Sequence, residues 1–249
     1  MNYRGLTSTC VGALCITLLA ACGGGGGGGD APANVLVPPP PVTSPPPTTA
    51  SFPLAAGFKS RIDAGVSDSF DISQGCSGTA TIALAAATSA PFEGITAVAS
   101  QQTFTASVSG CPITSGTSTG TTYYNAQYAN LGVAVSGGEY ASFQAAPTPL
   151  PSTVQINNSG SIVTLNTFSN SAKTTLTGTR VIRWQIEADG TTTTSAIFNL
   201  STENYNASNL LLSLQQSRYR IAQNGALTIT TIDVQFSGTS VLRLLYTKR

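Results

Sequence analysis

The fold class is decided by an alternating stretch, Val181-Ile182-Arg183-Trp184-Gln185-Ile186-Glu187. Ile182, Trp184 and Ile186 share one parity, and the mostly polar side chains beside them share the other. Successive side chains of a strand point to opposite faces, so this period of two predicts a strand with one buried and one wet face. Similar alternation recurs over residues 79–84, 103–108 and 241–246.

These runs predict an all-β fold, an antiparallel sandwich or meander. Asp189-Gly190 and Asn224-Gly225 have the sequences of two-residue hairpin turns, in which both central residues take positive φ. Residues 153–249 are therefore predicted to form an antiparallel meander.

One strand of this meander changes parity. Leu227 and Ile229 share one parity, whereas the later apolar residues Ile232, Val234 and Phe236 share the other. A β-bulge near Thr230-Thr231 would keep all five side chains on the core side. The alternative is a strand that is partly buried on both faces.

The composition excludes several classes of function. The chain is 41% hydrophobic and 8% charged, with 11 basic and 10 acidic residues and no histidine. The low charge excludes nucleic-acid binding through a basic surface, and the missing histidine excludes Ser-His, Cys-His and His-metal chemistry. No nucleophile or phosphate-loop motif occurs, so we predict no enzyme activity, cofactor or metal site. Asp63, Asp68 and Asp71 lack the spacing of a calcium loop, and we expect them to cap turns in solvent.

The N-terminus has the features of a secretory signal over residues 1–21. Arg4 supplies positive charge, and the apolar run 11–19 is too short to span a bilayer. Leu19-Ala20-Ala21-Cys22 then resembles the lipobox of bacterial lipoprotein precursors. The resemblance implies lipid on Cys22 after cleavage, and Gly23 behind it implies sorting to the outer membrane of a Gram-negative cell.

A linker is predicted over residues 22–53. It contains seven consecutive glycines, Gly23–Gly29, and nine of the 14 prolines of the chain. Glycine runs behave as flexible coil and proline runs as extended spacers, so neither forms a core.

The remaining residues are predicted to form a lobe over 54–150 and a meander lobe over 151–249. The prolines of 147–151 lie at the boundary, where the charge also divides. Residues 54–152 carry two basic and five acidic side chains, and residues 153–249 carry eight basic and four acidic ones. A single domain over 54–249 explains the prolines equally well.

Two cysteines lie in the first lobe, Cys76 and Cys111. Export leads to an oxidising compartment, so we predict a disulfide between them, worth roughly 3–4 kcal/mol for a loop of about 35 residues. The alternative, a redox or metal pair, does not match the known spacings.

Ligand contacts are predicted at two places. Tyr123, Tyr124 and Tyr128 lie near Asn125 and Asn130. Flat rings beside amides can stack on sugars, although such rings also pack at sheet edges with wet hydroxyls.

The second place is a strand on which Arg218 and Arg220 share one face. Together with Arg180, Arg183 and Arg243 they could form a basic strip for anionic lipid or lipopolysaccharide phosphate. The alternative is an ordinary solvated strand face.

A further resemblance lies in this C-terminal region. It is carried by the blocks Glu203-Asn204-Tyr205-Asn206, Ser217-Arg218-Tyr219-Arg220-Ile221-Ala222 and Gly225-Ala226-Leu227. After a Cys-Gly start, these are similar to uncharacterised outer-membrane lipoproteins of Gram-negative bacteria. That group has no assigned activity, so the resemblance implies no function.

We therefore predict an outer-membrane protein, lipid-anchored and facing the periplasm or the exterior. Its β-domain would have a non-enzymatic structural role or bind a protein or glycan. The alternative is a lipid or lipoprotein carrier, a half-barrel with a cavity lined by Trp184, Phe198 and Phe236. A continuous apolar cavity would favour the carrier, and interdigitated packing would favour the structural role.

Overall fold

The computed structural model describes residues 50–110, 113–237 and 242–249. The predicted signal peptide and nearly all of the predicted linker lie outside these residues. The described part contains one helix followed by strands. In chain order the elements are α1 (Leu54–Ala64), β1 (Val66–Ser73), β2 (Ser77–Leu84), β3 (Thr88–Phe92), β4 (Ile95–Ser109), β5 (Gly116–Tyr124), β6 (Asn130–Val135), β7 (Tyr140–Phe143), β8 (Ser159–Phe168), β9 (Leu176–Ala188), β10 (Ser195–Asn206), β11 (Leu211–Ala222), β12 (Leu227–Phe236) and β13 (Leu242–Lys248).

The strands form one antiparallel sheet that closes on itself. Its order is β2-β1-β13-β12-β11-β10-β9-β8-β7-β6-β5-β4-β3, and β2 also pairs with β4. Every strand except β3 therefore belongs to a closed barrel, and β3 is attached through β4 alone. The predicted all-β antiparallel fold is confirmed. Closure adds a feature that the sequence left open, and it removes the free edges of the ring.

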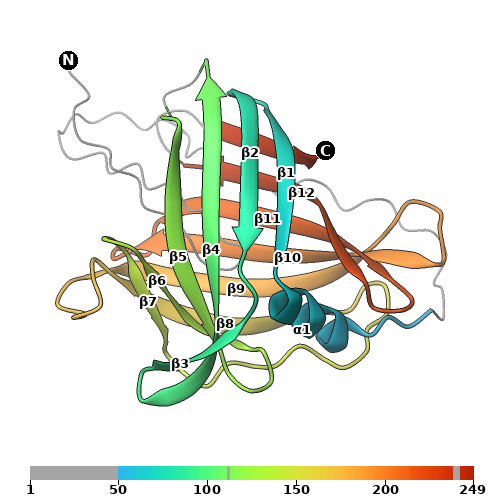
Figure 1. Cartoon of the computed structure of the whole chain (residues 1–249), viewed down its shortest axis with the longest axis horizontal. Coiled ribbons are helices and arrows are strands. Elements are labelled where there is room, and N and C mark those ends of the chain that lie inside the picture. Colours follow the sequence, from blue (N-terminus) through green and yellow to red (C-terminus); the bar gives the residue numbers. More distant parts are fainter. Residues whose placement is uncertain (1–49, 111–112, 238–241) are drawn as a thin grey trace.

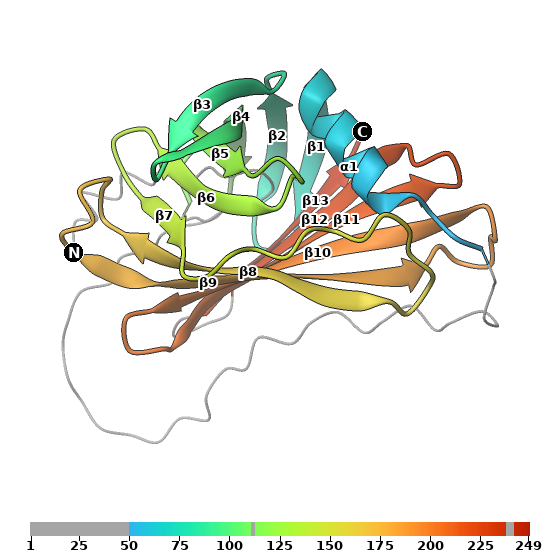
Figure 2. The ribbon, with the colours of Figure 1, turned by 90° about the horizontal axis from the view of Figure 1, so that it is seen from below.

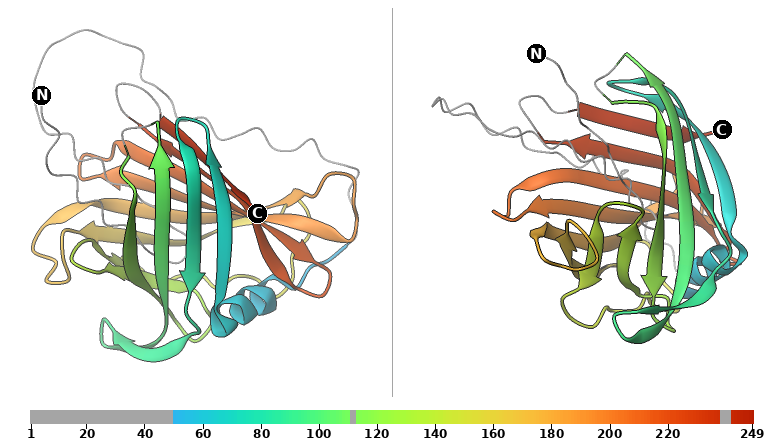
Figure 3. Two further views of the ribbon diagram at one scale, coloured as in Figure 1. Left: turned by 45° about the horizontal axis from the view of Figure 1, so that its top comes forward. Right: turned by 60° about the vertical axis from the view of Figure 1, so that its left-hand side comes forward.

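The barrel is flattened into two layers. β1, β2, β4 and β5 form one layer, which crosses the layer of β8 to β13 at a steep angle (Figure 1, Figure 3). The inward side chains of both layers form one apolar cluster. For example, the ring of Tyr246 lies 6.4 Å from that of Phe70 and 6.3 Å from that of Phe104, both edge to face. Packing across the layers thus fills the inside of the barrel.

The second layer is the predicted meander, because β8 to β13 pair in chain order. The predicted bulge is also confirmed. Arg218 pairs with Thr231 and Tyr219 pairs with Ile229, so Thr230 is the extra residue. Its Oγ1 donates to the Arg218 carbonyl (3.0 Å). Four of the five apolar side chains around the bulge belong to the core cluster, and the fifth, Leu227, is partly buried against it.

The two predicted hairpin turns are longer than two residues, so their predicted length was wrong. Residues 189–194 connect β9 to β10, and Gly190 takes the expected positive φ of 60°. At the β11–β12 turn, the backbone N–H of Ala222 donates to the Ala226 carbonyl (3.1 Å), and Gly225 has a φ of 86°. A three-residue loop with one left-handed glycine fits the twist of a hairpin as well as the expected turn does.

The proline-rich segment 147–151 is packed against the folded part. The backbone N–H of Thr148 donates to the Ile162 carbonyl (2.8 Å). Strands β7 and β8, on either side of the segment, pair with each other. Phe52, at the end of the predicted linker, is buried and exchanges two backbone hydrogen bonds with Val154 (2.9 Å each). Both sides of the segment therefore share one sheet and one core, and the division into two lobes stays a prediction.

Candidate functional site

α1 closes one end of the barrel. It lies across the gap between the two layers, as the view from below shows (Figure 2). Leu54, Phe58 and Ile62 are spaced by four residues, so they lie on one face of the helix, and all three are buried. This face enters the barrel as a plug. No helix was predicted over these residues, and the four-residue spacing of the apolar side chains is the signal that would have indicated one.

A glycine sets how closely α1 approaches the β11–β12 turn. A Cβ at Gly57 would overlap the carbonyl oxygen of Gly225. Glycine inside a helix is less favourable than alanine by about 1 kcal/mol, so this contact needs the missing side chain. Gly65, with a φ of 67°, ends the helix and is the single residue between α1 and β1.

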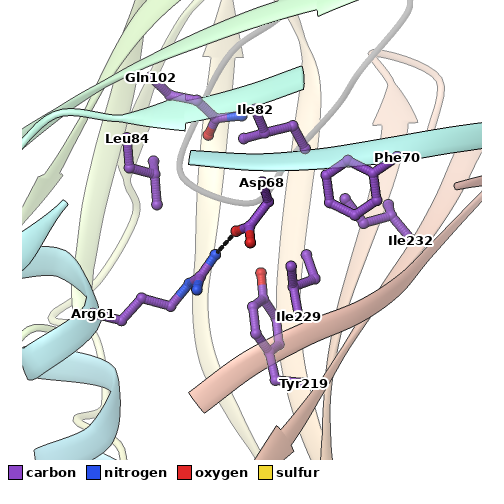
Figure 4. A pocket seen from close by; sticks show the side chains of 9 residues that line it. All are labelled: Arg61, Asp68, Phe70, Ile82, Leu84, Gln102, Tyr219, Ile229 and Ile232. Carbon is purple, nitrogen blue, oxygen red and sulfur yellow. Dashed lines mark hydrogen bonds and ion pairs between the residues drawn. The ribbon is translucent and has the colours of Figure 1, made fainter. Parts of the chain in front are cut away.

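Arg61 of α1 reaches into the barrel and pairs with Asp68 of β1 (Figure 4). The two side chains are only 8% and 5% exposed. Asp68 also accepts a bond from Lys248 Nζ of β13 (2.5 Å), so two cations share one carboxylate. The Arg61 guanidinium carbon lies 5.4 Å from the centre of the Tyr219 ring, within cation–π range. The expected solvated role of Asp68 was wrong, because its parity in β1 turns it toward the core.

This cluster leaves a buried donor unsatisfied. Arg61 Nε is inaccessible to solvent and has no hydrogen-bond partner. An unmade bond of this kind costs about 1–3 kcal/mol. The adjoining space is lined mainly by apolar side chains such as Ile82 and Leu84, and it is about the size of one water molecule. The cluster therefore keeps an unused capacity to bind a polar atom.

Phe58 fills the other side of the plugged end. Its ring meets Tyr124 (6.1 Å) and Phe198 (6.4 Å) edge to face. A second small space adjoins Phe58 and is also bounded by Tyr128 and Asn130. Asn130 Oδ1 is buried there without a hydrogen-bond partner. The plug thus has an unsatisfied donor on one side and an unsatisfied acceptor on the other.

The outer flank of α1 carries a second polar contact. Lys59 and Asp63 form an ion pair, the Tyr128 hydroxyl donates to Asp63, and Lys59 Nζ lies 4.5 Å from the centre of the Tyr128 ring. The bonds from Lys59 and Tyr128 hold the pKa of Asp63 below its ordinary value, and the bonds to Asp63 and Tyr128 raise the pKa of Lys59. Asn125 accepts bonds from two backbone N–H groups of the loop that presents Tyr128 (2.9 Å each).

The three predicted tyrosines do not form one patch. Tyr124 and Tyr128 lie at the plugged end, with ring centres 6.3 Å apart. Tyr123 points to the other face of β5 and stacks on Phe92 (4.3 Å), in a second apolar cluster that also contains Tyr140. Neighbouring strand residues face opposite sides, so Tyr123 and Tyr124 separate.

An ion pair borders this second cluster. Tyr140 and Lys173 both donate to Glu93. Burial raises the pKa of Glu93, but these two bonds outweigh burial and hold the pKa below its ordinary value. Burial and the contact with Glu93 raise the pKa of Tyr140.

Arg218 and Arg220 share the outer face of β11, as predicted, but neither is a free cation. The arginines on the outer face of strands β9, β11 and β13 each pair with a carboxylate: Arg183 with Glu203, Arg218 with Glu187, Arg220 with Asp189 and Arg243 with Asp233. Arg180 points into the barrel instead and pairs with Glu139 (2.8 Å). The predicted strip is therefore electrically neutral and lacks one of its members.

The same pairing extends over the rest of the described chain. Every acidic and basic side chain in residues 50–110, 113–237 and 242–249 takes part in an ion pair. Within those ranges, no three side chains of His, Cys, Asp or Glu gather as metal ligands would. The helix in the part that the structure describes is too short to cross a bilayer.

The predicted lipidation site, Cys22, lies outside the described residues, and so does Cys111. Cys76 is buried directly before β2. The next residue, Ser77, pairs with Ser109 of β4. The disulfide itself stays a prediction.

No family model, curated protein or solved structure matches the chain. The predicted likeness to outer-membrane lipoproteins therefore stays a prediction. The main residues of the site, Phe58 and Arg61, were not among the candidates from the sequence. Their three-residue separation would place them on neighbouring parts of a helical face, but only the fold brings Asp68 and Tyr219 to them.

Proposed function

We propose that the chain is a lipid-anchored envelope protein whose barrel is a non-catalytic domain with a structural or binding role. The observation that carries this proposal is that every charged side chain in the described part of the chain is paired, on a closed barrel with a packed interior. Because the charged groups bind one another, the strands present a polar but neutral outer surface. Such a surface suits a protein or an uncharged glycan better than a polyanion.

The lipid anchor is proposed on Cys22. Its support is the lipobox-like Leu19-Ala20-Ala21-Cys22 after a short apolar run. Each buried CH₂ group contributes about 0.8 kcal/mol, so several acyl chains on one cysteine hold the protein far better than one. We propose the outer membrane as the location, with the barrel in the periplasm or on the cell surface.

Replacement of the anchor cysteine tests this part of the proposal. Cys22→Ser should move the protein from the membrane pellet to the soluble fraction, and the mass of the mature N-terminal peptide should lose its acyl groups. Cys15→Ser is the matched control and should leave the protein in the pellet. A Cys22→Ser protein that stays fully in the membrane pellet would contradict the anchor.

The carrier alternative has less support. The sheet is a closed barrel, and the residues proposed to line an open cavity, Trp184, Phe198 and Phe236, are at most 8% exposed and belong to the packed core. Solvent extraction of the purified protein should release no stoichiometric lipid beyond the covalent anchor. A stoichiometric free lipid would favour the carrier.

A further inference from the structure

α1 is held in the barrel differently from the strands. Each strand of the ring is hydrogen-bonded along its backbone to two neighbours. The backbone of α1 meets the segment before β8 through a bond from Ala55 to the Pro151 carbonyl (3.2 Å), and no side chain caps its N-terminus. A helix of 11 residues is marginal by itself, so α1 stays in place mainly through its side chains.

Two of those side chains occupy separate sites in the barrel. Phe58 contributes a ring that lies edge-on to two aromatic walls, Tyr124 and Phe198. Arg61 contributes a cation that pairs with buried Asp68 and lies over the face of Tyr219. The end of the barrel thus accommodates an apolar ring and a cation about one helical turn apart.

The two small spaces lie beside these two side chains. Arg61 bounds one of them, Phe58 bounds the other, and the remaining walls belong to the barrel. Gly65, with a φ of 67°, is the single residue between α1 and β1, and Phe52, before the helix, is held by its backbone pairing with Val154. If α1 turned outward at this glycine, the two spaces and the volume of its buried side chains would become one pocket.

We propose that α1 is a removable plug and that the space it fills is a binding site for an amphipathic cation, an apolar or aromatic group that carries an amine or guanidinium. Such a ligand reproduces what α1 now supplies. Its apolar part contacts Tyr124 and Phe198, and its cation replaces Arg61 on Asp68 and Tyr219. This site goes beyond the proposed function and does not depend on the lipid anchor.

Hydrogen exchange on the full chain tests whether the plug opens by itself. The amides of α1 should exchange at least about tenfold faster than those of β10 and β11, because they open without unfolding the barrel. Phenylbutylguanidinium, which carries a ring and a guanidinium, should speed the exchange of α1 and leave β10 and β11 unchanged. Exchange of α1 at the rate of the central strands, with and without this probe, would overturn the proposal.

A substitution tests the chemistry of the site. Arg61→Gln removes the cation of α1 and leaves Asp68 with Lys248 alone, so phenylbutylguanidinium should bind this variant at least about tenfold more tightly than the original chain, by calorimetry. Arg220→Gln removes an outer arginine and should bind like the original. Phenylbutyrate and phenylbutanol, the anionic and neutral counterparts, should bind Arg61→Gln at least about tenfold more weakly than the cation. Equal binding of the three probes, or equal affinity of the cation for both arginine variants, would overturn the assignment. If Arg61→Gln does not fold, the hydrogen-exchange experiment on the original chain still tests the proposal.

Discussion

The plugged end of the barrel and the outer face of the β8–β13 layer both carry arginine–aspartate ion pairs, but the first is buried and the second is in contact with water. Arg61 and Asp68, inside the barrel, are 8% and 5% exposed, whereas Arg220 and Asp189, on the outer face, are 56% and 16% exposed. Inside, the pair joins a helix to the barrel, and the buried Arg61 has no second carboxylate among the described ion pairs if Asp68 is lost. Outside, water screens the pair, which mainly makes the surface neutral. Position, rather than residue type, therefore separates a structural ion pair from a superficial one.

Removal of the inner carboxylate should have the largest effect. Asp68→Asn leaves Arg61 buried beside an uncharged amide, so we expect a loss of about 3–5 kcal/mol in the free energy of unfolding. Asp189→Asn removes the corresponding outer carboxylate and should lose less than about 1 kcal/mol. Urea denaturation of both variants measures the difference. Equal losses would show that the two pairs do not differ as their exposure indicates.

Adding a methyl group to α1 where it contacts the β11–β12 turn should have the next largest effect. Gly57→Ala would normally favour a helix by about 1 kcal/mol. Here the new Cβ meets the Gly225 carbonyl, so we expect a net loss of about 1–3 kcal/mol. Gly116→Ala, in β5, meets nothing within 4 Å and should change stability by less than about 1 kcal/mol. A thermal melt in which Gly57→Ala is the more stable variant would mean that α1 does not pack against this turn.

The outer pairs should respond to salt, and the inner ones should not. Arg183→Gln should lose about 0.2–1 kcal/mol at low salt and almost nothing near 1 M salt, because screening already removes the interaction. Arg180 is 1% exposed, so the penalty of Arg180→Gln, which leaves Glu139 without its cation, should persist at both salt concentrations. Denaturation curves at two salt concentrations make the comparison. A salt-independent loss for Arg183→Gln would contradict it.

The same contrast separates what could be predicted from the sequence. Strands of the meander follow from local alternation, and even the bulge at Thr230 follows from a change of parity within one strand. Closure of the barrel does not, because it depends on β2 pairing with β4 across the segment that contains β3. Alternation tells which side chains are buried but does not choose between an open sheet and a closed one.

The candidate site was less predictable than the fold. Arg218 and Arg220 share a face, as their spacing predicts. Their partners are Glu187 in β9, two places away in the sheet, and Asp189 in the turn that follows it. α1 was missed because it has a glycine in its middle and no capping side chain, which weakens the local signal for a helix. Asp68 resembles a solvated aspartate in sequence, and only tertiary packing gives it two cations.

The smallest effect should be that of pH near neutrality. The chain has no histidine, the side chain that usually titrates between pH 5 and 8, so the free energy of unfolding should vary by less than about 0.5 kcal/mol from about pH 5.5 to 8.5.

At lower pH, protonation of the outer carboxylates should lower the free energy of unfolding. The pKa values of Asp63 and Glu93 are lowered, and burial raises that of Asp189 less than its bonds from Arg220 and Ser195 lower it. A lowered pKa in the folded state stabilises the protein above the ordinary value near pH 4, and this contribution is lost as the pH falls through the lowered values. Urea midpoints should therefore be constant from about pH 5.5 to 8.5 and decline below about pH 4. The decline should be less steep in Arg220→Gln. A marked change of midpoint between pH 5.5 and 8.5 would require a titrating group that the described ion pairs do not supply.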